Sequence, residues 1–423
     1  MNGNLIIKNA SELVTCSGFE ARKGQEMSRL DVICNGALVI EKGLITKVGA
    51  TEETLAGFDT SLFNVIDATG KTVLPGFIDP HTHLIFGGYR AEEFSWRLSG
   101  VSYMEIMQRG GGIVNTVRAT RKAAKNELIE LGKKRLDSML SFGVTTVEGK
   151  SGYGLDRDTE IKQLEVMREL DASHPVDIVS TFLGAHAVPE EYRDRADGFI
   201  DYLISEVLPD IAALKLAEFC DVFCEKGVFS LEQSERLLER ARAYGLKPKL
   251  HADEMTTLGG AELAARLRAV SADHLLYASS RGIEEMARAG VIAVLLPGTA
   301  FSLKEPYAQA RFIIDSGCAV ALATDFNPGS CFSESIPLMF ALATLYMGMT
   351  LEEAIIAFTI NGAAAIGRAD TIGSLDPGKA GDAVVLEFPS YKYIPYHTGV
   401  NNVEKVIKNG RVVVDRLEGG RTV

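Results

Sequence analysis

The sequence has none of the features that would place the protein in a membrane or outside the cell. Its apolar runs all fall well short of the roughly 18 residues of a membrane span. The N-terminus has no basic segment followed by a long apolar one, so we expect no signal peptide. The six cysteines are scattered without any Cys-x-x-Cys pair, which favours reduced thiols in a cytoplasmic protein.

The sequence also has fewer basic residues than acidic ones. The 44 lysines and arginines are outnumbered by 56 aspartates and glutamates, which gives a formal net charge of −12 and argues against nucleic acid as a main partner. With 46% hydrophobic and 24% charged residues, the composition is that of a soluble globular protein. The 423 residues suffice for about two to three average domains, or for one large α/β barrel with an appendage.

Strand-like and helix-like segments alternate through residues 71–372. Apolar runs recur there, each followed by an amphipathic, charge-rich stretch such as 126–141, 231–244 or 259–268. This repetition predicts a (β/α)8 TIM barrel, with a doubly wound open sheet as the competing arrangement. The eight runs are 76–79, 143–148, 177–186, 220–225, 248–251, 271–275, 291–296 and 319–325.

The two ends of the chain have a different pattern, of short strands and turns. Residues 1–70 contain apolar or alternating runs bounded by Gly and Asn, and 403–414 predict a hairpin around Asn409-Gly410. Neither end can bury enough apolar surface alone. We therefore expect 1–70 and 373–423 to form one small β-sandwich domain, with the barrel occupying 71–372.

The apolar run 73–78 leads into Asp79-Pro80-His81-Thr82-His83, and we interpret the run as one short buried strand. Side chains alternate between the faces of a strand, so His81 and His83 point the same way, about 6.6 Å apart. Two imidazoles in this arrangement can bind one metal ion. An isolated His-x-His can equally be two polar residues in a loop, so the metal interpretation depends on partners elsewhere.

Polar residues end most of the predicted strands. In a (β/α)8 barrel, catalytic residues lie at the C-terminal ends of the strands. Five of the seven histidines fall at such ends, which is difficult to explain as core packing. These are His81, His83, His186, His251 and His274, and the acidic residues at or near strand ends are Glu148, Glu225, Glu254, Asp273 and Asp325.

Three histidines and one aspartate make a suitable ligand set for one metal ion. We expect His81, His83, His251 and Asp325 to bind it, with an open position for water. Such ligands suit zinc, and iron also fits. The metal would lower the pKa of a bound water and polarise a carbonyl. A second metal would need a bridging group, often a lysine at the end of the fourth strand, but Lys226 lies one residue past the strand-end acid, so one metal is favoured.

Two further residues are candidates for proton transfer. Glu254 lies three residues after His251, close enough to carry a proton without being a ligand, although it could also be a surface carboxylate. His274 could hold the nucleophile or polarise the electrophile. The predicted catalytic set is therefore Glu254, His274 and Asp325.

Several motifs resemble those of the amidohydrolase superfamily, and the resemblance covers essentially the whole chain. They are PGFIDPHTH, HADE, SADH, ATDFNPG and GSLDPGKAGDAVV. These alone would fit many deaminases and cyclic amidases. Narrower motifs are similar to those of the superfamily's imidazolone-ring hydrolases: FGGYRAEEF, QRGGGI at 108–113, VEGKSGYGL at 147–155, FLGAHAVPEEY at 182–192 and DFNPGSC at 325–331.

The resemblance implies a metal-dependent hydrolase barrel that opens the ring of 4-imidazolone-5-propanoate with metal-activated water. The product would be N-formimidoyl-L-glutamate, in the third step of histidine degradation. An arginine fork suits the carboxylate of this substrate, and backbone amides of the Asn327–Ser330 turn could meet an anion. The resemblance also suggests a homodimer. The implied substrate-binding residues are Arg90, Tyr153, His186, Glu254, Asn327, Gly329 and Ser330.

Other functions remain as alternatives. A metal-dependent deaminase of a purine- or pyrimidine-like ring would use the same metal, Glu254 and His274, but a neutral base offers no partner to the carboxylate-binding set around Arg90. A non-catalytic scaffold would be expected to lose metal ligands. Gly110-Gly111-Gly112 lacks the Gly-Lys-Ser/Thr of a phosphate-binding loop, and a flap over the site is our hypothesis for it.

Overall fold

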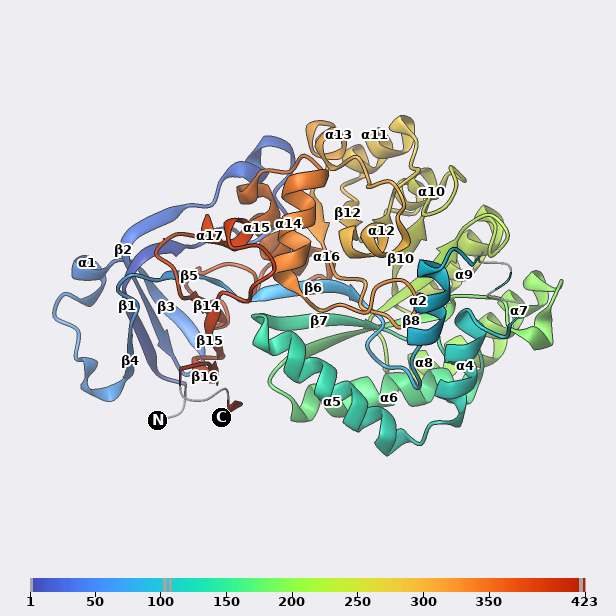
Figure 1. Ribbon diagram of the computed structural model, residues 1–423, viewed down its shortest axis with the longest axis horizontal. Coiled ribbons are helices and arrows are strands. Elements are labelled where there is room, and N and C mark those ends of the chain that lie inside the picture. The colour runs from blue at the N-terminus through green and yellow to red at the C-terminus, as the bar shows by residue number, and fades with distance from the viewer. Residues whose placement is uncertain (1–2, 102–104, 106–108, 418–420, 423) are drawn as a thin grey trace.

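The computed structural model describes residues 3–101, 105, 109–417 and 421–422. Gln108, which begins the QRGGGI motif, lies outside the described residues. Figure 1 shows two parts, a sheet near both ends of the chain and a larger barrel surrounded by helices. None of the described helices is long and apolar enough to cross a membrane.

Eight parallel strands form the barrel, and their hydrogen-bonded order follows the order of the chain. Each strand coincides with one of the eight predicted runs, so the (β/α)8 prediction is confirmed. Both faces of the strands are largely buried, so apolar residues in the runs do not follow a simple alternation, and the polar residues among them are buried as well. The strands are β6 (Phe77–Thr82), β7 (Val144–Lys150), β8 (Asp177–Ala185), β9 (Phe219–Cys224), β10 (Lys247–Ala252), β11 (Ser271–His274), β12 (Ile292–Leu295) and β13 (Val320–Leu322).

The barrel closes just beyond the ends of β6 and β13. His83 N–H donates to the Phe326 carbonyl at 2.9 Å, and Asp325 N–H donates to the His81 carbonyl at 3.1 Å. The Asp79 carboxylate accepts from the Thr324 hydroxyl at 2.6 Å and from the Thr324 N–H at 3.0 Å. Closure therefore brings the first and last strand-end motifs side by side.

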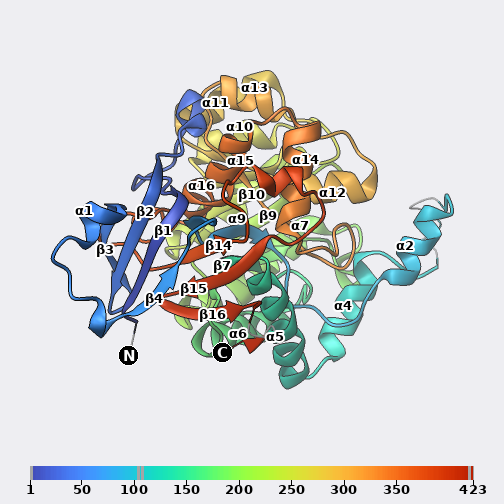
Figure 2. The same ribbon diagram turned by 60° about the vertical axis from the view of Figure 1, so that its left-hand side comes forward.

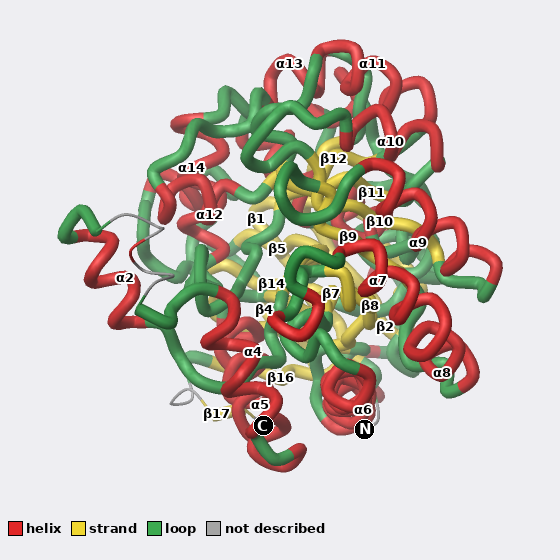
Figure 3. Tube along the Cα trace, turned by 90° about the vertical axis from the view of Figure 1, so that its right-hand side faces the viewer, coloured by secondary structure: helices red, strands yellow, loops and turns green. Residues whose placement is uncertain are grey.

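Helices cover the outside of the barrel (Figure 3). Their start signals are visible in the sequence: Ser230 with Gln233, and Thr350 with Glu353, form capping boxes. The helices are α2 (Ala91–Leu98), α4 (Ile113–Lys122), α5 (Lys125–Ser141), α6 (Arg157–Ser173), α7 (Ala196–Tyr202), α8 (Leu208–Ala213), α9 (Leu231–Ala243), α10 (Gly260–Leu267), α11 (Ser280–Ala289), α12 (Pro297–Leu303), α13 (Ala310–Asp315), α14 (Ile336–Tyr346), α15 (Leu351–Phe358) and α16 (Ile360–Ala365). Figure 2 shows α2 projecting from the body of the molecule beyond α4.

Both ends of the chain contribute to one nine-stranded mixed sheet, as predicted. The sheet folds on itself, because Gly381 N–H donates to Gly43 in the β2–β3 turn at 2.7 Å while Gly410, in the β15–β16 turn, donates to Gly381 at 2.9 Å. The strand order is β17 (Arg421–Thr422), β16 (Arg411–Asp415), β15 (Val403–Lys408), β14 (Ala383–Leu386), β5 (Thr72–Pro75), β1 (Leu5–Val14), β2 (Val32–Glu41) and β3 (Leu44–Ala50), with β4 (Asn64–Asp67) beside β1. The short helix α1 (Thr51–Leu55) packs against β2 and β3, whereas α17 (Tyr393–Tyr396) packs against α14.

The interpretation of 73–78 as one strand is wrong. The run is divided at Gly76 into β5, which pairs with β1 and β14, and β6, which begins the barrel. Gly76 N–H donates to the Asp382 carbonyl at 3.0 Å, and Phe77 N–H donates to Gly143 at 2.9 Å. An apolar run does not show where its hydrogen-bonding partners change, because both halves are buried.

Gly76 stands where the chain passes from one sheet to the other, and it has no room for a side chain. A Cβ there would overlap Thr145, whose own Cβ would be 2.9 Å away. We expect Gly76→Ala to destabilise the fold by about 1–3 kcal/mol through overpacking. Thermal unfolding would measure this as a lower Tm.

Gly198→Ala is the matched control. Gly198 lies in α7, and its added Cβ would meet nothing closer than 3.9 Å. Alanine favours a helix over glycine by about 1 kcal/mol, so Tm should be unchanged or higher. An unchanged Tm for Gly76→Ala would contradict the account of the crossing point.

Candidate metal centre

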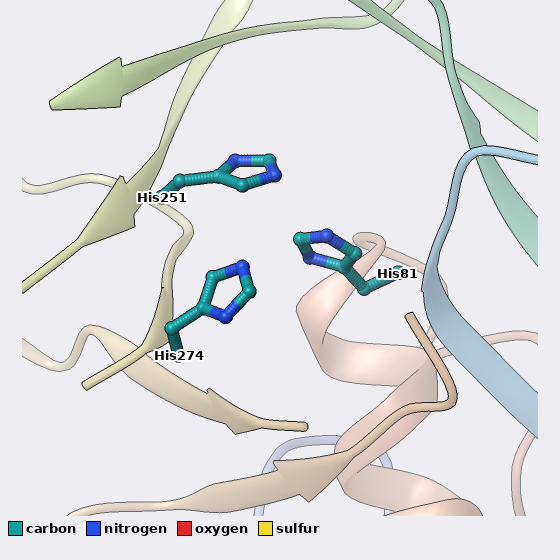
Figure 4. Close-up of side chains that lie close together, drawn as sticks. All are labelled: His81, His251 and His274. Carbon is teal, nitrogen blue, oxygen red and sulfur yellow. The ribbon is translucent and has the colours of Figure 1, made fainter. Parts of the chain in front are cut away.

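The five strand-end histidines gather at the C-terminal end of the barrel. His81 lies in β6 and His83 directly follows it, His186 follows β8, and His251 and His274 lie in β10 and β11. The ring centroids of His81 and His251 are 4.6 Å apart, and those of His251 and His274 are 5.2 Å apart. Figure 4 shows these three rings extending from different strands towards a common space.

Two histidines and one carboxylate have the spacing of ligands to a single ion. His81 Nε2 and His83 Nε2 are 3.3 Å apart, and each lies 3.5 Å from Asp325 Oδ1. Ligand atoms at about 2.1 Å from a tetrahedral metal lie about 3.4 Å from one another. His251 shares ligand-atom clusters with His81 and with His83 in which all atoms lie within 4.8 Å of one another.

Several ring nitrogens here are buried without a hydrogen-bond partner. They are His83 Nδ1, His251 Nε2 and both nitrogens of His274. Buried polar atoms are normally paired, so such a group indicates a missing ligand. Burial holds the pKa of His81, His83 and His274 well below the usual range, which keeps these rings in the neutral, metal-binding form. The residues present therefore fit a metal ion.

Glu254 lies beside this cluster on a loop that is firmly held. The Asp253 carboxylate accepts from four backbone N–H groups of residues 258–261, at 2.9 to 3.1 Å. Glu254 Oε2 is 3.5 Å from His274 Nε2. Burial raises the pKa of Glu254 to about 8, and the Asp325 carboxylate adds to the shift. A carboxyl group with this pKa can both accept and donate a proton near neutrality.

Arg90 and Gly329 meet at the edge of the site. Arg90 Nε donates to Glu93 Oε2 at 2.8 Å, and the same oxygen accepts from Gly112 N–H at 2.9 Å. The Arg90 guanidinium fills the position that a Cβ on Gly329 would need. A glycine at 329 is therefore required for Arg90 to lie there.

The Asn327–Ser330 turn is closed by its own side chain. Asn327 Oδ1 accepts from the N–H groups of Gly329 and Ser330, both at 2.8 Å, while its Nδ2 donates to the Asp325 carbonyl at 2.6 Å. In this structure the two amides are thus engaged within the turn. The two amides would meet an anion only if Asn327 gave up these two contacts.

Tyr153 and His186 line the other side of the histidine cluster. The Tyr153 ring centroid is 5.8 Å from that of His83, and His186 stacks on His83 at 4.8 Å. His186 Nδ1 is 3.1 Å from the Gly152 carbonyl. The loop that carries Tyr153 is held by Glu160, which accepts from three of its backbone N–H groups at 2.8 to 3.0 Å.

Comparison with known proteins agrees with this geometry. A family model described as the amidohydrolase family matches residues 72–413. The chain belongs to the amidohydrolase family. It is 63% identical to the imidazolonepropionase of Clostridium tetani, over 97% of this chain and 98% of the relative. It is 61% identical to that of Parabacteroides distasonis, over 97% and 99%, and 60% identical to one of Bacteroides fragilis, over 97% and 99%.

Solved amidohydrolase-like structures share the fold at much lower identity. A triazine hydrolase variant superposes with a TM-score of 0.70 at 17% identity, covering 97% of this chain and 95% of that one. A zinc-bound adenosine deaminase from Xanthomonas campestris gives 0.68 at 17%, covering 97% and 93%. At these identities the similarity shows the fold alone.

Two carboxylates behind the amidohydrolase site were not assigned a role from the sequence. Asp273 Oδ2 lies 2.6 Å from His81 Nδ1, and Asp221 Oδ2 lies 3.0 Å from His251 Nδ1. Each contact leaves Nε2 of its histidine facing the site. The sequence feature that could have pointed to such a role is an acidic residue inside an apolar strand, as Asp221 is in Phe219–Cys224.

We expect the metal-stripped amidohydrolase to lose stability as the pH rises from about 6.5 to 8, between the ordinary pKa of histidine and the raised pKa of about 8 for Glu254. Across this range the folded state holds a proton that the unfolded state has released. The Glu254 contribution to stability is therefore largest at low pH and falls by up to about 1.4 kcal/mol per pH unit. Below about pH 6.5 the buried neutral histidines act in the opposite direction, because unfolding lets them take up protons.

Thermal unfolding of chelator-treated protein at a series of pH values would measure this slope. Glu254→Gln cannot titrate, so its Tm should fall less steeply than that of the wild type. Some slope should remain, because burial also raises the pKa of Asp79 to about 7 and that of Asp325 to about 6. Identical slopes in the two proteins would contradict a raised pKa at Glu254.

Proposed function

We propose that the chain hydrolyses the ring of 4-imidazolone-5-propanoate to N-formimidoyl-L-glutamate, the third step of histidine degradation. The observation that carries the proposal is a buried histidine–carboxylate cluster whose Asp325 leads into a turn where Gly329 meets the Arg90 guanidinium. Relatives named imidazolonepropionase, 57–63% identical over at least 97% of the chain, support it.

One metal ion would be held by His81, His83, His251 and Asp325. Zinc is favoured, and iron suits the same donors. When bound, the metal supplies a water of lowered pKa and polarises the substrate carbonyl. Asp273 and Asp221 orient two of the histidines, and the Thr299 hydroxyl donates to Asp325 Oδ2 at 2.5 Å, which leaves Oδ1 towards His81 and His83.

Glu254, His274 and Asp325 would take part in the proton transfers of the reaction. Ring opening adds one water: the carbonyl carbon gains an oxygen, its bond to the ring nitrogen breaks, and that nitrogen takes a proton. The ionised Glu254 carboxylate would accept a proton from water, and the carboxyl group so formed would give it to the leaving nitrogen, a role that suits its pKa near neutrality. His274, 3.5 Å from Glu254, positions that carboxyl and polarises the carbonyl, while Asp325 is the second candidate acceptor.

The propionate of the substrate would bind Arg90 through its planar fork. Tyr153 and His186 would enclose the ring beside His83. Asn327, Gly329 and Ser330 would contact the amino-acid end of the substrate or product, with Asn327 releasing the two backbone amides that it holds in this structure.

We further propose a cytoplasmic homodimer with two domains in each chain. All six cysteines are free thiols, which suits a reducing compartment. Large α/β enzymes commonly pair with two-fold symmetry. The domains would be 1–70 with 373–423, and the barrel at 71–372, although β5 lies past residue 70 and pairs in the small sheet.

A spectrophotometric assay with freshly generated imidazolone propionate tests the function. The metal-loaded protein should remove the ring absorbance, release formimidoylglutamate and stop on addition of a chelator. Protein that holds one metal but leaves the substrate intact would overturn the proposal. Release of ammonia from an aminated purine or pyrimidine would instead favour the deaminase alternative.

Arg90→Ala should raise KM by about 10- to 100-fold with a smaller change in kcat, because a charge-assisted hydrogen bond to the substrate is lost. Arg90→Lys keeps the charge but loses the planar fork, so its KM should lie between those of the wild type and Arg90→Ala. Gly329→Ala should also raise KM, since its Cβ would displace the Arg90 guanidinium.

Arg118→Ala provides the control for these KM measurements. Arg118 is exposed on α4 and pairs with Glu190, so its loss should leave both constants unchanged. An unchanged KM in Arg90→Ala would show that the carboxylate is bound elsewhere.

Glu254→Gln should retain the metal content of the wild type and lose turnover by about 100- to 10,000-fold, the usual range for a general acid–base group. Metal analysis and kcat measured on the same preparation would check both parts. Loss of the metal would make Glu254 a ligand instead.

A further inference from the structure

Five charged side chains are buried inside the barrel beneath the histidine cluster. Glu148, Lys150, Asp221, Lys249 and Asp273 all have zero relative exposure, and we call them the carboxylate–lysine cluster. Burying charge is costly unless each group is paired, so a cluster of this size needs an explanation beyond core packing. With every group ionised, three carboxylates face two ammonium groups.

Lys150 occupies the centre of the carboxylate–lysine cluster. Its Nζ lies 2.7 Å from Asp221 Oδ2, 2.9 Å from Glu148 Oε1 and 3.3 Å from Asp273 Oδ2. An ammonium group has three N–H donors on one atom, one for each carboxylate. Burial lowers the pKa of Lys150, but the three carboxylates outweigh it, beginning with Asp221, and the pKa is raised.

Two of these carboxylates are the ones that touch candidate metal ligands. The oxygen of Asp221 that contacts Lys150 also lies 3.0 Å from His251 Nδ1. The oxygen of Asp273 that contacts Lys150 lies 2.6 Å from His81 Nδ1. One ammonium group thus fixes the positions of two acceptors that belong to two different strands and two different histidines.

Lys249 differs from Lys150 in making no ion pair with Asp221 or Asp273 among the described residues. It is equally buried and carries the same charge, but its ion pair in the cluster is with Glu148 Oε2, at 2.6 Å. Glu148 contacts no histidine among the ion pairs of the described residues, and it accepts a further hydrogen bond from the Thr181 hydroxyl. The two lysines therefore offer a comparison at constant charge and burial.

We propose that Lys150 is a positioning residue for the metal centre: by holding Asp221 and Asp273 together, it aims Nε2 of His251 and of His81 at one point. The inference rests on the proposed metal site. Side chains that orient metal-ligating histidines through a carboxylate contribute to metal affinity although they do not touch the ion. Lys150 acts one step further from the metal, because it holds the two carboxylates, and it holds both of them at the same time.

The test is the zinc dissociation constant of the full-length protein, measured by competition with a chromophoric chelator. Lys150→Met removes the three donors and the charge at similar side-chain length, and should weaken zinc binding by about 10- to 100-fold. Lys249→Met removes the same charge from the same cluster and should change it by no more than about threefold, because it touches neither carboxylate that contacts a histidine. The Tm of both metal-free variants should fall together.

Lys150→Gln gives a second comparison. Its amide donates hydrogen bonds without charge but reaches fewer acceptors, so its zinc affinity should lie between those of the wild type and Lys150→Met. If Lys150→Met does not fold, the zinc affinities of Lys150→Gln and Lys249→Gln are compared instead. The inference again requires that only the variant at position 150 loses zinc affinity.

If the wild-type protein binds one zinc per chain, two results would overturn the inference about Lys150 and leave the zinc centre standing. One is a Lys150 variant with wild-type affinity, and the other is an equal loss of affinity at Lys249, which would make the effect one of charge or stability. Wild-type protein that takes up no zinc would overturn the zinc centre and this inference with it.

Discussion

The closure of the barrel between β6 and β13 is the constraint on which the site depends. Asp79 and Thr324 are 245 residues apart in sequence, and their paired hydrogen bonds join the first strand to the end of the last. The adjacent backbone bonds bring His81 and His83 next to Asp325. Without this closure His81 and His83 would lie at one edge of an open sheet and Asp325 at the other, with His251 on a strand between them.

Desolvation gives the enclosed site its chemical character. Burial keeps His81, His83 and His274 neutral and raises the pKa of Glu254, so the same low-dielectric environment provides metal-binding rings and a titrating acid. The cost of burying charge is offset by pairing, most completely around Lys150. Stability and function thus depend on one set of interior polar contacts.

Backbone conformation contributes at the same strand ends. Asp253, His274 and Asp325 all have positive φ, at 50°, 76° and 52°. Side chains other than glycine are unfavourable in this region by about 1–2 kcal/mol, so the surrounding contacts must hold them there. For Asp253 the contacts are the four N–H groups of the following loop. The turns direct the polar side chains into the site.

Local patterns in the sequence were sufficient for the architecture and for the composition of the histidine cluster. Buried strands repeat with a regular alternation, and histidines at strand ends are visible without any knowledge of pairing. The break at Gly76 was missed, because it comes from a change of hydrogen-bonding partner, from Asp382 to Gly143, that the apolar run itself does not show. The cluster around Lys150 was also missed, since Asp221 and Asp273 lie on β9 and β11 and approach this β7 lysine only when the barrel forms.

The most direct test of the account is the position of the metal in a crystal of the metal-loaded protein, located by anomalous scattering. The account predicts one peak per chain, at about 2.0–2.2 Å from His81, His83, His251 and Asp325. A peak bound by His81, His251 and His274, or by His83, His186 and His251, would contradict it, since both sets are also close enough to hold an ion.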